Sequence, residues 1–245
     1  MTDPASPARP PSSVPKAKAV ALRPRDAATL IVLDRRSRAP KVLMGRRNAG
    51  LAFMPGKFVF PGGRIEPGDK RMPVANALPD YAEAALTRQV TRPPHHLGRA
   101  LALAAIRETF EETGLLIGTR AYGPPEDVPA GWEAFARHGV LPDLEALHFV
   151  ARAITPPKRV RRFDTRFFTV DRRAVAAEEP GRVSADAEFT ELAWFTLPAA
   201  RKLDLPTITG LILDELEAQV AVDFAPYRPI PFHAERHGRR ERTVL

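Results

Sequence analysis

The stretch that most constrains the fold of this chain spans residues 107–115 and reads Arg-Glu-Thr-Phe-Glu-Glu-Thr-Gly-Leu. It spaces Glu108, Glu111 and Glu112 as i, i+3 and i+4 of a helix predicted for residues 99–114, which stops at the glycine of the stretch. Carboxylates at these spacings repel one another by roughly a few tenths of a kcal/mol per pair. A cation would relieve this repulsion, and ligands that are all oxygen favour Mg²⁺ or Mn²⁺.

The predicted helix also carries an apolar stripe. Leu103, Ile106 and Phe110 recur at i, i+3 and i+7, and at about 100° per residue the three carboxylates fall on the side away from them. The pattern therefore predicts one face that packs and another that can coordinate a metal. The alternative is an ordinary solvated helix face on which Arg107 and Glu111 form an i, i+4 ion pair.

Composition changes along the chain predict its organisation. Residues 1–24 are rich in Pro, Ser, Ala and Lys and are expected to form a disordered leader. One domain is expected over residues 25–222, with an insertion at about 70–98 that carries several prolines in a weak pattern. Residues 223–245 are expected to form a Pro- and Arg-rich tail.

Strand and helix patterns alternate through the expected domain, which predicts a mixed α/β or α+β fold. The expected strands are 28–33, 41–45, 57–60, 147–154, 162–170 and 189–195, and the further expected helices are 81–90, 132–137, 198–203 and 208–222.

Composition excludes several classes of function. Cysteine is absent, which rules out disulfides and thiolate chemistry and fits a cytoplasmic location. No run of about 18 apolar residues is present, so no membrane contact is expected. The net charge of +8 is compatible with an anionic partner or with a merely basic surface.

The Phe-Pro-Gly-Gly turn at residues 60–63, taken together with residues 107–115, resembles the Nudix box, the signature of the Nudix hydrolase superfamily. That box reads G-x5-E-x7-R-E-U-x-E-E-x-G-U, where U is a bulky apolar residue. Its first glycine matches Gly63, and its second half matches residues 107–115.

Three departures from the box are visible. Asp69 occupies the position of the first glutamate, and Thr109 stands where a bulky apolar residue is expected. Residues 70–106 separate the two halves, where the box has seven residues. Such an insertion costs little, because loop-closure entropy grows slowly with length.

The resemblance implies a Nudix-type α/β/α sandwich around a mixed β-sheet, and hydrolysis of a nucleoside diphosphate linked to another group. It implies that Glu108, Glu111 and Glu112 bind Mg²⁺ or Mn²⁺ with the backbone carbonyl of Gly63. Glu108 or the metal would activate water, and Arg107 would orient the carboxylates, so Glu108, Arg107 and Glu111 are the expected catalytic residues.

Further segments are similar to the coenzyme A diphosphatase branch of the superfamily, namely residues 44–47, 53–63, 155–157 and 162–168. The implied substrate is coenzyme A or an acyl-CoA, cleaved into 3′,5′-ADP and a phosphopantetheine product. Because that substrate carries a diphosphate and a 3′-phosphate, Arg46, Arg47, Arg162 and Arg166 are expected to bind it.

Other interpretations stay open. The leaving group could belong to ADP-ribose, NADH or a nucleotide sugar, or the chain could be a non-catalytic nucleotide- or RNA-binding module of the same fold. Glu188 is a candidate for a further acid, against Glu178, Glu179 and Asp186 and against a plain surface role. A small nucleotide is the expected partner in preference to nucleic acid, and a homodimer is left open.

Overall fold

The computed structural model describes residues 22–157, 159–226 and 228–245, so residues 1–21 of the predicted leader lie outside it. Nine strands form one sheet in the order β11-β10-β6-β7-β1-β2-β3, with β4 paired to β1 and β9 to β2. The strands are β1 (Arg25–Asp34), β2 (Lys41–Arg47), β3 (Phe58–Val59), β4 (Gly62–Arg64), β6 (His148–Ile154), β7 (Phe163–Asp171), β9 (Phe189–Thr196), β10 (Pro231–Arg236) and β11 (Arg239–Val244).

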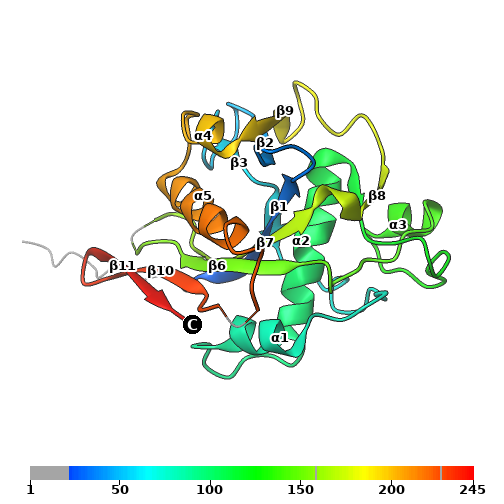
Figure 1. Cartoon of the computed structure of the whole chain (residues 1–245), viewed down its shortest axis with the longest axis horizontal. Coiled ribbons are helices and arrows are strands. Elements are labelled where there is room, and N and C mark those ends of the chain that lie inside the picture. The colour runs from blue at the N-terminus through cyan, green and yellow to red at the C-terminus, as the bar shows by residue number, and fades with distance from the viewer. Residues whose placement is uncertain (1–21, 158, 227) are drawn as a thin grey trace, which may run out of the picture.

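The sheet is mixed and lies between two helical layers. β1 pairs with β7 and β10 with β6 in parallel, and the other pairs in this sheet are antiparallel. Figure 1 shows α5 on one side of the sheet and α2 on the other. This arrangement confirms the predicted α/β/α sandwich. The helices are α1 (Asp80–Thr87), α2 (Leu97–Thr113), α3 (Glu133–Arg137), α4 (Leu197–Ala200) and α5 (Thr207–Val220), and β5 (Leu115–Ile117) with β8 (Val175–Glu178) forms a separate ladder.

The continuous apolar run of β1 follows from its central position. Leu30 and Val32 face the core on the α2 side, whereas Ile31 and Leu33 face the core on the α5 side. Because alternate residues of a strand point to opposite faces, a strand that is covered on both faces carries apolar residues at successive positions.

Helix α2 confirms the predicted element but not the predicted single packed stripe. Thr109 and Arg107 are almost wholly buried, and Glu112 is only 7% exposed. The side chain of Glu111 is 40% exposed. The helix is covered on nearly every side, because Gly62 and Gly63, predicted as a turn and found at the start of β4, lie against the face that the sequence pattern left open.

The predicted insertion is a packed structure. It contains α1, which lies against α2 near the foot of the molecule in Figure 1. Met72, Leu86 and Leu97 are buried in the same core cluster as α2. Neither α1 nor any other helix in the described ranges is long and apolar enough to cross a membrane.

The segment expected as a Pro- and Arg-rich tail contributes two strands to the sheet. β10 pairs in parallel with β6, and β11 returns antiparallel along β10. His237 and Gly238 connect them with φ values of 52° and 75°, as a two-residue hairpin turn requires. The composition of the segment hid this turn, whose sequence signal is the single glycine.

Candidate active site

The last two turns of α2 and the glycines at the start of β4, Gly62 and Gly63, form the centre of the candidate site. The helix ends at Gly114, whose φ of 81° is left-handed and whose N–H bonds to the carbonyl of Phe110. A Cβ on Gly114 would lie 2.0 Å from the carbonyl oxygen of Glu179. Glycine is therefore required both by the backbone conformation and by the close approach of the neighbouring chain.

Thr109, at the position where the box has a bulky apolar residue, is fully buried. Its hydroxyl donates to the carbonyl of Ala105 at 2.7 Å. Since this bond satisfies the hydroxyl inside the helix, Thr109 enters the core without an unpaired polar group.

Arg107 joins the two halves of the interrupted box. Its Nε and Nη2 donate to the two carboxylate oxygens of Asp69 at 2.8 and 3.2 Å, and Nη2 also donates to the carbonyl of Arg64 at 2.9 Å. The side chains of Arg107 and Asp69 are 1% and 0% exposed. Asp69 also accepts the backbone N–H of Glu66 at 2.7 Å. The shorter carboxylate at position 69 thus reaches Arg107 in a two-pronged buried ion pair.

Arg107 also touches two carboxylates of its own helix. Its Nη1 lies 3.1 Å from Glu108 Oε1 and 3.1 Å from Glu111 Oε2. Burial opposes the charged form, but the bonds to Asp69 and the charges of these carboxylates outweigh it and raise the pKa of Arg107. The guanidinium is therefore a fixed positive charge behind the site.

The Gly62–Gly63 turn receives the other carboxylates. The N–H of Gly62 donates to Glu112 Oε2 at 2.9 Å. A Cβ on Gly63 would lie 2.3 Å from Glu108 Oε1, and one on Gly62 would lie 2.4 Å from the carbonyl oxygen of Ala28. Only a chain without side chains at these two positions can lie this close to Glu108 and Glu112.

These two carboxylates carry an electrostatic cost. Burial, with a smaller contribution from Glu111 and Glu188, raises the pKa of Glu108 to about 7 against the opposing effect of Arg107. Burial, followed by the charge of Glu188, raises the pKa of Glu112 well above its usual range. Desolvated like charges of this kind are stabilised by a nearby cation.

The three predicted metal ligands are not gathered together. Within the described ranges no three acidic or histidine side chains form a group that could hold a metal ion. Glu108 and Glu112 lie at the glycine turn, whereas Glu111 is held by Arg107. A buried and a partly buried carboxylate beside an open backbone still suit a hard divalent cation such as Mg²⁺, which keeps several water ligands.

Glu188 lies immediately before β9, and its charge acts on both Glu108 and Glu112. Its Oε1 accepts from Arg47 Nη1 at 2.6 Å, and Arg47 Nε also donates to the carbonyl of Phe53. Among Glu178, Glu179, Asp186 and Glu188, Glu188 is the acid whose charge raises the pKa of both Glu108 and Glu112, and it remains the candidate for a further acid.

The remaining predicted arginines differ in availability. Arg46 lies over the ring of Phe58 and pairs with Glu191 at 3.1 Å, and its side chain is half exposed. Arg162 donates to the backbone carbonyls of Thr155 and Leu22.

Arg166 has no exposed side-chain surface and pairs with Asp26 and Asp164. A guanidinium in that position is enclosed between the strands and offers no surface to a ligand. The substrate contact expected of Arg166 therefore has no surface to support it.

The contribution of the turn before Asp69 escaped the sequence reasoning. The carbonyl of Arg64 and the N–H of Glu66 hold Arg107 and Asp69 in place. The Glu-Pro-Gly-Asp run at residues 66–69 is a turn signal that could have indicated a rigid loop at this point.

No family model matches the chain. It is 27% identical over 236 residues to the acyl-coenzyme A diphosphatase NUDT19 of Gallus gallus, across 72% of this chain and 62% of that protein. The crystal structure of a NUDIX hydrolase from Alicyclobacillus acidocaldarius superposes with a TM-score of 0.60 and 27% identity, over 82% of this chain and 96% of that one. The chain spans less than two thirds of the length of the curated relative.

The sandwich fold, the split box and these similarities define the class that the chain resembles, the Nudix hydrolase superfamily. Within the superfamily it resembles an acyl-coenzyme A diphosphatase, as the segments around Arg46 and Phe60 predicted.

Proposed function

We propose that the chain is a Mg²⁺- or Mn²⁺-dependent diphosphatase whose substrate is coenzyme A or an acyl-CoA, with 3′,5′-ADP and a phosphopantetheine product released. One observation carries the proposal: Glu112 is buried and Glu108 partly buried against Gly62 and Gly63 of β4, and behind them Arg107 is fixed by Asp69. The similarity to a relative named as an acyl-coenzyme A diphosphatase supports the choice of substrate.

Glu108, Glu112 and the carbonyl of Gly63 would hold the metal, which when bound would act as a Lewis acid toward the diphosphate. Glu111 is half-exposed and bonded only to Arg107 among the described residues, so a rotation of its side chain would allow it to join them.

The proposed reaction is a simple hydrolysis. The oxygen of water forms a bond to one phosphorus, the bond from that phosphorus to the bridging oxygen breaks, and two phosphate monoesters leave. Glu108 is the candidate to accept the proton of the water, because its carboxylate lies directly against Gly63 at the centre of the site. Arg107 keeps Glu108 oriented through its contact at 3.1 Å.

A substrate panel tests the proposal. Coenzyme A, ADP-ribose and NADH are each incubated with the protein and Mg²⁺ or Mn²⁺, and products are separated by chromatography. Coenzyme A is expected to give 3′,5′-ADP at the highest kcat/KM. Glu111→Gln and Glu112→Gln are each expected to lower kcat by about 100-fold or more, with the far-UV circular dichroism unchanged.

Glu126→Gln is the matched control, since Glu126 is an exposed loop carboxylate. Preference for ADP-ribose or NADH would identify the protein as a diphosphatase of those nucleotides instead of coenzyme A. Absence of turnover together with tight, salt-sensitive binding of RNA would replace it by a binding module. Full activity in both glutamine variants would remove the mechanism. A cytoplasmic location and a homodimer are likewise untested predictions.

A further inference from the structure

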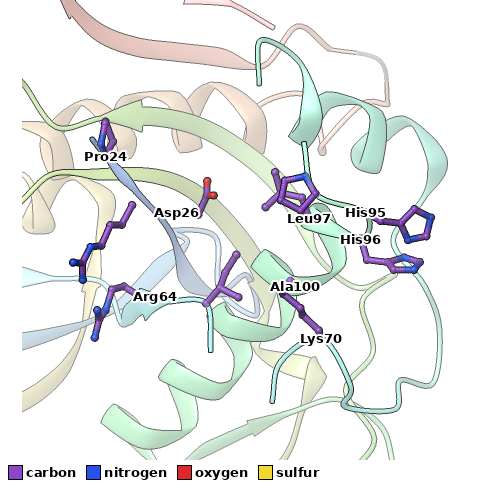
Figure 2. A pocket seen from close by; sticks show the side chains of 11 residues that line it. Pro24, Asp26, Arg64, Lys70, His95, His96, Leu97 and Ala100 are labelled. Carbon is purple, nitrogen blue, oxygen red and sulfur yellow. The ribbon is translucent and has the colours of Figure 1, made fainter. Parts of the chain in front are cut away.

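A cavity with a volume of about 410 Å³ lies at the opposite end of α2 from the glutamates. Its lining comes from the start of β1, from the end of β4 and from both ends of the insertion. Figure 2 shows Asp26 and Arg64 on the strand side and His95 and His96 next to each other on the insertion side, with Lys70 beside Ala100. The insertion therefore provides one side of this cavity.

The charged lining is mainly cationic. Arg25, Arg64 and Lys70 line the cavity, and within the part of the chain that the structure describes their side chains form no ion pair. The single carboxylate of the lining, Asp26, is already paired with Arg166 at 2.7 Å. The cavity thus presents an excess of positive charge that no side chain neutralises.

Behind Asp26, Arg166 is fully buried, and among the described residues its Nε and Nη2 have no hydrogen-bond partner. Because Arg166 pairs with both Asp26 and Asp164, the excess positive charge of the cavity comes from Arg25, Arg64 and Lys70.

The rest of the lining is apolar. Ile65, Pro94, Leu97 and Ala100 contribute this surface. A cavity with apolar walls and cationic side chains suits a ligand that carries an anionic group on a ring or sugar. Free inorganic ions would leave the apolar surface unused.

The cavity is within reach of the glutamate site. Arg64 lines the cavity and directly follows Gly63, and its carbonyl accepts from Arg107. Eight residues of α2 separate Ala100 from Glu108, which at the helical rise is a distance of about 12 Å. A single nucleotide can span such a distance.

We infer that this cavity binds a phosphate monoester of the substrate that is separate from the diphosphate undergoing cleavage. Arg25, Arg64 and Lys70 contact the phosphate, and the apolar lining contacts the group that carries it. The insertion completes this subsite, which makes it a determinant of substrate choice. The inference rests on the proposed function, because it takes the substrate to be a diphosphate with a further phosphate.

The test compares two substrates that differ only in that phosphate, coenzyme A and dephospho-coenzyme A. Lys70→Glu is expected to lower kcat/KM for coenzyme A by about tenfold or more, the size of one lost charge-assisted bond, and to leave that for dephospho-coenzyme A nearly unchanged. Arg25→Gln is expected to act in the same direction. Lys202→Glu, an exposed cation in the turn after α4, is the control for a change of net charge.

If Lys70→Glu lowers kcat/KM equally for both substrates, or for neither, the inference is overturned and the proposed function is unaffected. If the wild-type protein cleaves neither substrate, the proposed function fails. The subsite is then judged by calorimetric binding of 3′,5′-ADP and 5′-AMP. Preference for 3′,5′-ADP that disappears in Lys70→Glu supports the subsite, and equal affinities overturn it.

Discussion

Replacement of Asp69 by alanine tests the central ion pair of the site. Asp69 and Arg107 are 0% and 1% exposed, and their two hydrogen bonds measure 2.8 and 3.2 Å. Removal of Asp69 leaves a buried guanidinium with only part of its partners. The loss of one member of a buried ion pair costs about 3–5 kcal/mol.

This loss of free energy of unfolding corresponds to a large decrease in Tm. For a chain of this size, about 2–4 °C of Tm corresponds to each kcal/mol, so Asp69→Ala is expected to lower Tm by about 6–20 °C. Urea denaturation followed by circular dichroism measures the same loss as a free energy of unfolding. Asp69→Glu restores the charge and the residue type of the box, and it is expected to recover most of the stability.

A surface pair supplies the reference. Asp204 pairs with Lys57, and its side chain is 71% exposed. Asp204→Ala is expected to cost at most about 1 kcal/mol. If Asp69→Ala cost no more than Asp204→Ala, the buried pair would not be what joins the two halves of the box, and the reasoning would be refuted.

Two further predictions concern the glycine turn and its carboxylates. In chelator, Glu108 is expected to destabilise the fold increasingly as pH rises from about 4.5 to about 7, because its raised pKa means that the folded state binds the extra proton in this window. The full penalty of about 3 kcal/mol is present above pH 7. Urea titrations should therefore show that the free energy of unfolding of Glu108→Gln, relative to that of the wild type, is higher at pH 8 than at pH 5. An unchanged difference would contradict the raised pKa of Glu108. Gly63→Ala is expected to displace Glu108, since the added Cβ would lie 2.3 Å from Oε1, and kcat should fall by about 100-fold or more. Gly210→Ala is the control, because a Cβ added there meets no neighbouring side chain within 4 Å, and it should retain activity.

Local sequence patterns predicted the elements well. The apolar run that became β1 and the helix that ends at Gly114 were both readable, because burial on two faces and a left-handed cap leave local signals. The two halves of the box were also recognisable across the insertion.

Long-range contacts were not readable from local pattern. The cover over the carboxylate face of α2 comes from Gly62, which lies 50 residues from Glu112 in the chain. The burial of Arg166 depends on Asp26 and Asp164, two residues from different strands. Periodicity describes one element at a time, so it could place Glu112 on a face of the helix but could not predict what lies against that face.

The structure also explains how the box tolerates its interruption. Lengthening the connection from seven residues to the span 70–106 costs about 1.5 kcal/mol of closure entropy. The buried pair of Arg107 with Asp69 spans the same gap, and the loss of either partner would leave an unpaired buried charge. Leu86 and Leu97 of the insertion are buried in the core, and this apolar burial further stabilises the fold. The two halves of the site are therefore held together by contacts across the gap, and the inserted chain is free to supply a wall of the neighbouring cavity.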